Sequence, residues 1–310
     1  YVQENSWFDD GNNGLCSRSL RADACAKQLF EYLCSVYGKK ILTAQQECGH
    51  HEKSNMEVDF IKEKTGHLPA IRGLDFISDG FGQIVERAKK WHSLGGIVTI
   101  CWHCGINGGG YKQSQEDVPD FDKLFEDGSP EQTAMLESWD RAANALAQLR
   151  DAGIPVLWRP FHEFDGGWFW WGKGGAECFI RLWRMMYEHF TKQFNLTNLI
   201  WVLGYADDVR EGWYVGDNYC DIVGSDTYRG GVHKPGFDRL SEVAPNKPRC
   251  FHECGILPKI EEFENSGCMW MWFMIWHTKW LFDNDEESLK AFYNSDKALT
   301  LDDTARDLNA

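Results

Sequence analysis

The residues best suited to catalysis in this sequence lie in two Phe-His-Glu triplets. Phe161-His162-Glu163 and Phe251-His252-Glu253 each follow a short apolar run that is typical of a buried strand. A glycosidase needs a pair of carboxyl groups at its active site, and these two glutamates at strand ends could supply it. One protonates the leaving oxygen, while the other, in its ionised form, attacks the anomeric carbon or activates water. The triplets therefore predict chemistry on carbohydrates.

Aromatic residues accompany the first triplet. Trp168, Trp170 and Trp171 follow it closely, and flat apolar rings are the surfaces on which sugar rings stack. Trp168 is either such a platform or part of the core. Trp170 and Trp171 are expected in the core. The same holds for Trp270 and Trp272, because they alternate with methionines along a predicted strand.

The elements that must position these residues alternate regularly between strand and helix patterns. Strands are expected over residues 41–45, 69–76, 97–102, 154–158, 198–203, 220–225, 249–253 and 269–275. Helices are expected over residues 17–38, 56–65, 81–94, 131–151, 176–194, 237–243, 259–265 and 286–293. Eight such units predict an α/β fold, the (β/α)8 TIM barrel, as one catalytic domain over residues 1–310 with an N-terminal helical segment. Residues 105–130 are expected to be a structureless loop that is functional or mobile.

The composition of the chain excludes some classes of binding partner. The chain has 310 residues and a net charge of −15, which argues against binding to nucleic acid or anionic membranes. The longest apolar run, residues 268–276, is shorter than the roughly 20 residues that span a bilayer. Eleven cysteines and the sequon at Asn195 favour a secreted protein. The start without methionine suggests a processed chain. Cys101 and Cys104 are expected to form a disulfide or to be buried thiols rather than a redox motif.

Residues 159–172, Arg-Pro-Phe-His-Glu-Phe-Asp-Gly-Gly-Trp-Phe-Trp-Trp-Gly, resemble the strand-four signature of glycoside hydrolase family 26. The best-known members of this family are β-mannanases, and the resemblance extends from about residue 41 to residue 276. It implies that Glu163 is the acid/base and Glu253 the nucleophile of a retaining endo-1,4-β-mannosidase. It also implies a substrate of mannan-type polysaccharides or oligosaccharides, with β-1,3-xylan or mixed-linkage β-glucan as alternatives.

The resemblance further implies the residues that line the subsite of cleavage. They are His103, His162, Trp168, Tyr228 and Trp276. Two departures leave the linkage and the endo or exo mode open. Residues 104–110 replace a stretch that often contains Asn-Pro in mannanases, and His277 stands where some members have arginine. We expect a secreted monomer without a cofactor or metal.

These residues also allow other interpretations. The histidines and acids at 50–52, 103, 162–163 and 252–253 could serve a metal-dependent barrel hydrolase, but they lack HxH or HExxH spacing. Adjacent His and Glu residues on a strand should also face opposite sides. A non-catalytic carbohydrate-binding barrel would be expected to lack one of the two glutamates.

Each candidate also has a structural interpretation. Glu163 and Glu253 could form ion pairs with Arg72 or Arg159, and His103 taken alone is more often a core histidine. Tyr228 could simply pack, or its hydroxyl could hold the nucleophile and favour the ionised carboxylate. Asp75 and Asp226 also end predicted strands, where they are expected to support neighbouring residues rather than to contact a ligand.

Overall fold

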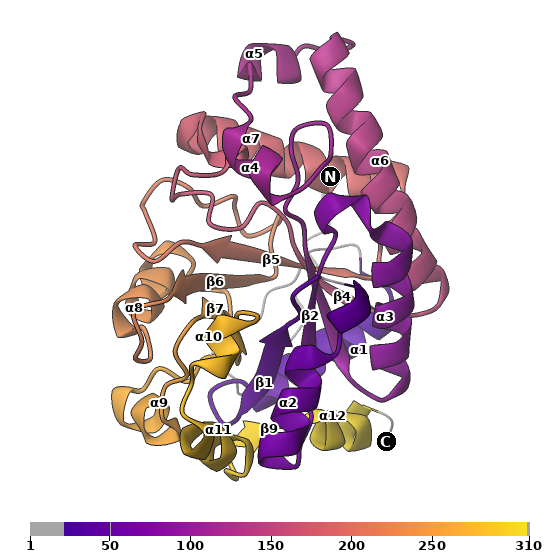
Figure 1. The fold of residues 1–310 in the computed structure, drawn as a ribbon. Helices are drawn as coiled ribbons and strands as arrows, with labels where there is room; N and C mark the ends of the chain where they lie inside the picture. The colour runs from indigo at the N-terminus through magenta and orange to yellow at the C-terminus, as the bar shows by residue number, and fades with distance from the viewer. Residues whose placement is uncertain (1–21, 50, 309–310) are drawn as a thin grey trace.

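The computed structural model describes residues 22–49 and 51–308, and in them eight parallel strands close into a barrel surrounded by helices (Figure 1). The strands are β1 (Ile41–Gln46), β2 (Ile71–Asp75), β3 (Ile97–Cys101), β4 (Val156–Arg159), β5 (Leu199–Tyr205), β6 (Ile222–Thr227), β7 (Arg249–Cys254) and β8 (Trp272–Ile275). β1 pairs with both β8 and β2, which closes the barrel. A short ninth strand, β9 (Ala298–Leu299), pairs with the start of β1. The prediction of a (β/α)8 barrel is confirmed.

The longer helices lie close to the predicted ranges, except α12, which was not predicted. They are α1 (Ala24–Val36), α2 (Met56–Thr65), α3 (Phe81–Ser93), α6 (Pro130–Asp151), α7 (Gly175–Glu188), α8 (Lys234–Val243), α9 (Ile260–Ser266), α11 (Glu286–Tyr293) and α12 (Leu301–Leu308). Short segments are α4 (Tyr111–Glu116), α5 (Phe121–Leu124), α10 (Lys279–Phe282), η1 (His51–Lys53), η2 (Ile77–Asp79), η3 (Trp170–Gly172) and η4 (His189–Gln193). None of the helices in the described part of the chain has the length and apolar character needed to cross a bilayer.

Two apolar layers hold these elements together. One layer lies between the outer faces of the strands and the surrounding helices, and it includes Trp158, Trp170 and Trp270. The other joins inward-facing side chains of the strands to α1. Since Leu29 and Leu33 of α1 belong to this inner layer, α1 covers one end of the barrel. The residues at the carboxyl ends of the strands therefore surround the opposite end, where barrel enzymes have their sites.

Residues 105–130 were expected to be structureless, and this prediction is wrong. The segment contains α4 and α5, two short helices without an apolar stripe long enough to detect. The side chain of Asp120 accepts a hydrogen bond from the amide of Lys123 and so caps α5. Lys173 Nζ donates to the carbonyls of Gln115 and Asp117, which ties the segment to the loop after β4. The segment thus has regular secondary structure and forms part of the barrel mouth.

Candidate active site

Glu163 lies beyond β4 in a strained turn. β4 ends at Arg159, and Phe161 and Glu163 both have positive φ angles, of 51° and 53°. The amide of Glu163 donates to the carbonyl of Gly204 in β5 at 2.7 Å. Glu163 was predicted at the end of strand four, but it lies four residues beyond the end of β4. Residues with side chains rarely adopt such angles, and they persist where the surrounding contacts enforce them, often at functional sites.

The surroundings of Glu163 favour its protonated form. Burial raises the pKa of this carboxyl group well above its ordinary value, and the nearby charges of Asp226 and Glu253 raise it further. Trp168 Nε1 donates to Glu163 Oε2 at 2.8 Å and opposes the shift only in part. Trp168 remains 42% exposed beside the carboxyl group. Of the two roles considered for Trp168, the structure favours the exposed platform over core packing.

Glu253 in β7 is held by two hydrogen-bond donors. Arg159 Nη1 donates to Glu253 Oε1 at 3.2 Å, and Tyr228 Oη donates to Glu253 Oε2 at 2.9 Å. Arg159 is fully buried and also donates to Thr99 Oγ1 and Gln46 Oε1. The ion pair between Glu253 and Arg159, which is the structural interpretation of Glu253 given above, is present. It organises the carboxylate within the barrel mouth.

His252 and Glu253 contribute to the same buried network although they are adjacent in β7. His252 Nδ1 lies 2.7 Å from Asp226 Oδ1, and its Nε2 lies 2.9 Å from Arg159 Nη1. The expectation that neighbouring His and Glu face opposite sides is wrong here. The pairing of β6 with β7 shifts at Asp226, and that of β7 with β8 shifts after Phe251. Such irregularities interrupt strand alternation and redirect side chains.

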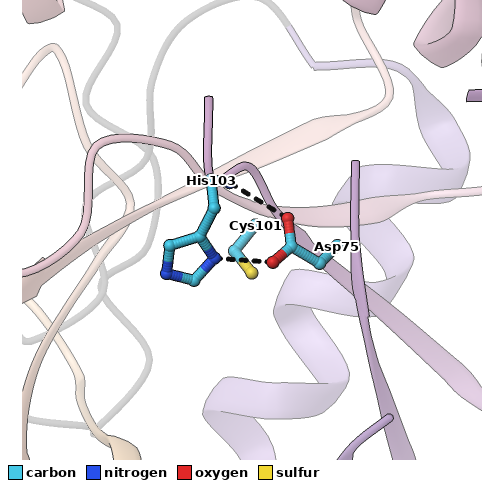
Figure 2. Close-up of side chains that lie close together, drawn as sticks. All are labelled: Asp75, Cys101 and His103. Atoms are coloured by element: carbon cyan, nitrogen blue, oxygen red, sulfur yellow. Dashed lines mark hydrogen bonds and ion pairs between the residues drawn. The ribbon is translucent and has the colours of Figure 1, made fainter. Parts of the chain in front are cut away.

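A second network is built on His103 and Asp75 (Figure 2). Asp75 at the end of β2 accepts from the backbone amide of His103 at 3.0 Å, and its other oxygen lies 2.6 Å from His103 Nδ1. His103 Nε2 lies 3.0 Å from His162 Nε2. Burial opposes a charge on His103, but the Asp75 carboxylate raises the pKa of His103 above its ordinary value. His162 is likewise buried, and burial together with His103 lowers its pKa well below normal. The two histidines thus have opposite pKa shifts, although their rings are in contact.

Two sets of acids and histidines lie close enough to consider metal binding. They are Asp75, Cys101 and His103 (Figure 2), and Asp226, His252 and Glu253. Their donor atoms already serve the hydrogen bonds described above, and Cys101 Sγ donates to the carbonyl of Leu74 at 3.5 Å. In the second set the Arg159 guanidinium supplies the positive charge. The His50 of the metal interpretation lies outside the described residues.

Trp276 and Tyr111 add aromatic rings to the mouth. Trp276 follows β8, and the centre of its ring lies 6.0 Å from that of His103. Tyr111 begins α4, with its ring centre 5.3 Å from that of His103 and 6.1 Å from that of Phe169. It is 49% exposed, and burial together with the charges of the two candidate glutamates raises its pKa. Sequence reasoning missed Tyr111, and its only signal was an aromatic residue soon after the Trp-His pair.

The remaining predicted residues divide between core and support. Trp170, Trp171, Trp270 and Trp272 are buried as predicted, with at most 1% exposure. Cys101 and Cys104 are buried free thiols, which was one of the two expected states. Arg72 pairs with Glu47 at 2.7 Å and takes no part in the network of Glu253.

This arrangement is that of a barrel glycoside hydrolase, with two carboxyl groups in opposite electrostatic surroundings and exposed aromatic rings beside them. The model of Glycosyl hydrolase family 26 matches residues 19–303. The chain belongs to this family.

Characterised relatives and solved structures agree with this membership. A mannan endo-1,4-β-mannosidase of Thermothelomyces thermophilus is 33% identical over 93% of this chain and 63% of its own length. A β-(1,4)-mannanase of Podospora anserina superimposes with a TM-score of 0.85 and 30% identity, covering all of this chain and 72% of that one. A β-mannanase from a symbiotic protist of the termite Reticulitermes speratus, complexed with gluco-manno-oligosaccharide, gives a TM-score of 0.83 at 29% identity, covering 97% of this chain and 99% of the other. The chain spans less than two thirds of the length of the Thermothelomyces relative.

Proposed function

We propose that this chain hydrolyses β-1,4-mannosidic linkages in mannan-type polysaccharides with retention of anomeric configuration. The observation that carries the proposal is the contrast between the two glutamates. Burial and neighbouring acids favour a protonated Glu163, while Arg159 and Tyr228 donate to Glu253. A carboxylic acid and a carboxylate at one site are what double displacement requires.

In the first step Glu253 attacks the anomeric carbon while Glu163 gives its proton to the leaving oxygen. The bond to the leaving sugar breaks, and a covalent glycosyl-enzyme forms through a Glu253 oxygen. In the second step Glu163, now ionised, takes a proton from water, and the resulting hydroxide displaces Glu253 from the anomeric carbon. Tyr228 and Arg159 hold the attacking carboxylate in place throughout.

The choice of mannan rests on the relatives, since the Thermothelomyces and Podospora proteins are both named for activity on β-1,4-mannan. The test is hydrolysis of linear mannan, galactomannan, glucomannan, β-1,3-xylan and mixed-linkage glucan by the wild type, with product sizes followed over time. Proton NMR of the first products reports the anomer. Cleavage of mannan with β-configured products supports the proposal. Cleavage of xylan or glucan alone would replace the substrate, and α-configured products would overturn the mechanism.

Asp226→Asn is expected to move the alkaline limb of the pH profile of kcat/KM to lower pH. Glu163 has to be protonated, and the charge of Asp226 is one cause of its raised pKa. Without that charge the pKa falls, so Glu163 loses its proton earlier as the pH rises and activity declines at a lower pH. The profile is measured beside that of Asp208→Asn, a variant without a role in this network, whose limb should stay in place. An Asp226→Asn limb that coincides with the wild type would contradict the assignment of Glu163.

Tyr111→Ala is expected to raise KM for long substrates by about two- to tenfold, because one aromatic contact with a sugar ring is lost. Tyr111→Phe keeps the ring and should retain a KM close to that of the wild type. The measurement is KM as a function of oligosaccharide length, with Val118→Ala as a control for an exposed residue of the same segment. Equal KM values for Tyr111→Ala and wild type at all lengths would remove Tyr111 from the binding surface.

We further propose that the protein is secreted. Cys34 is disulfide-bonded, and disulfides persist in oxidising compartments. Asn195 of the sequon is exposed and lies after η4. Expression through a eukaryotic secretory pathway should therefore give a protein whose mass decreases on treatment with an N-glycosidase, whereas Asn195→Gln should show no such decrease. An unglycosylated wild type would remove the support that the sequon gives.

A further inference from the structure

A buried carboxylate outside the catalytic network reaches the turn that carries Trp276. Glu57 is the second residue of α2, and it is fully buried. Its Oε1 accepts a hydrogen bond from the amide of Thr278 at 3.1 Å, across 221 residues of sequence. α2 follows β1 and Thr278 follows β8, and β1 and β8 are neighbours in the barrel. The bond therefore joins the two segments on either side of the β1–β8 seam.

The turn that Glu57 holds is strained. Thr278 has φ 52° and ψ −121°, a conformation that is unusual for a β-branched residue. Such a conformation persists only where neighbouring contacts enforce it. The Thr278 carbonyl accepts from the amides of Leu281 and Phe282 in α10, and the Thr278 amide is the group that Glu57 binds. Glu57 thus supplies the side-chain contact at the backbone of the strained residue.

Trp276 lies two residues before this strained position. Its amide donates to the carbonyl of Cys254 at 2.9 Å, and its carbonyl accepts from Gln45 Nε2 at 3.3 Å. These bonds fix the beginning of the turn, and Glu57 fixes its end. Only one residue separates Trp276 from Thr278, so these contacts hold adjoining parts of the same turn.

The carboxylate is suited to this task although it is buried. It lies in the first turn of α2, where the helix dipole favours a negative charge. Burial raises the pKa of Glu57 above its ordinary value, and the amides of Glu57 itself, Thr278 and Cys48 oppose this shift only in part.

We propose that Glu57 is a positioning residue that fixes the turn of residues 276–278 and so aims the Trp276 ring at a bound sugar. This inference rests on the proposed function in one respect, the contact between Trp276 and substrate. A purely structural role for Glu57 would instead stabilise the seam without affecting the binding of substrate.

The test measures kcat, KM and Tm for five variants on the glycan that the wild type cleaves. Glu57→Ala is expected to raise KM by about five- to tenfold. This increase corresponds to the loss of most of the binding energy of one contact between an aromatic ring and a sugar. Glu57→Gln retains an oxygen that accepts the Thr278 amide and should stay within about twofold of the wild type. Trp276→Ala should raise KM at least as much as Glu57→Ala. In the double variant Glu57→Ala/Trp276→Ala the two effects should not multiply, because Glu57 acts through Trp276.

Phe282→Ala is the matched control. Phe282 of α10 packs edge-on against Phe60 of α2, with ring centres 5.0 Å apart, so its removal loosens the same seam while leaving the Glu57 bond intact. It should lower Tm without raising KM. The proposal is overturned if Phe282→Ala raises KM as Glu57→Ala does, if Glu57→Ala leaves KM unchanged, or if the effects of Glu57→Ala and Trp276→Ala multiply.

A readout without turnover separates this proposal from the proposed function. In protein labelled with 5-fluorotryptophan, the ¹⁹F resonance of Trp276 is assigned by its loss in Trp276→Phe. It should shift in Glu57→Ala and keep its position in Glu57→Gln. If the wild type cleaves no glycan but this shift occurs, the proposed function fails and the positioning role stands. If the wild type cleaves mannan and the resonance does not move, the positioning role fails alone.

Discussion

Glu253→Ala is expected to lower kcat on mannan by about four to six orders of magnitude, because the covalent step loses its nucleophile. Tyr228 and Arg159, which donate to Glu253 in the wild type, remain in this variant. The carboxylate that attacks the anomeric carbon is gone. Added azide fits the space that the carboxylate leaves and should attack from the same side. The product is then a glycosyl azide of the α configuration, which NMR identifies. Glu264→Ala, a change of the same type in α9, is the matched control and should keep wild-type kcat.

Two results would contradict the assignment of Glu253. One is a loss of less than about tenfold in kcat, since a group that only binds substrate contributes on that scale. The other is an azide product with the β configuration, which would place the nucleophile elsewhere in the mouth. A Tm close to that of the wild type would show that the Glu253→Ala variant is folded. If removal of the ion pair with the buried Arg159 unfolds the protein, Glu253→Gln provides the same test with an uncharged side chain of similar size.

Glu163→Ala is expected to reduce kcat/KM on mannan by about two to four orders of magnitude, the usual contribution of general acid catalysis. The loss should depend on the leaving group. A dinitrophenol departs without a proton, so formation of the glycosyl-enzyme from a dinitrophenyl mannoside should stay close to the wild-type rate. The second step still needs a base, so this intermediate should accumulate and appear as a burst of dinitrophenol.

The pH profile provides the independent check on Glu163. The pKa of this group is raised well above its ordinary value, and the wild type should lose activity as the pH rises through it. Glu163→Ala has no proton to lose at this position, so that alkaline limb should disappear. An equal loss of activity on mannan and on the dinitrophenyl substrate, with the limb preserved, would assign the acid role to another residue.

The sequence was informative where local patterns and tertiary structure agree. α2 has the predicted bounds because a glycine with φ 84° ends it at residue 66. The eight strands appear within a few residues of their predicted positions, since runs buried on both faces are distinctive. Glu163 and Glu253 could be selected because each follows such a run. Their assignment as acid and nucleophile came from the family resemblance, and no local pattern supplies it.

The rest of the site depends on contacts between distant segments. The ring of Tyr111 lies against His103, and Lys173 in the loop after β4 donates to Gln115 in the same segment. His252 joins Asp226 because strand pairing is irregular, a feature that side-chain alternation cannot reveal. The contact of Glu57 with Thr278 likewise requires the barrel to close. Such contacts follow from topology, so they become visible only once the strands are assembled.

The positive φ angles of Phe161 and Glu163 have a consequence for laboratory evolution of this protein. Each such residue costs on the order of 1 kcal/mol or more in folding free energy, and glycine adopts the same angles freely. A selection for heat resistance alone would therefore reward the loss of the acid side chain at this turn. Libraries screened for stability need a parallel screen for turnover, or they will enrich well-folded but inert barrels.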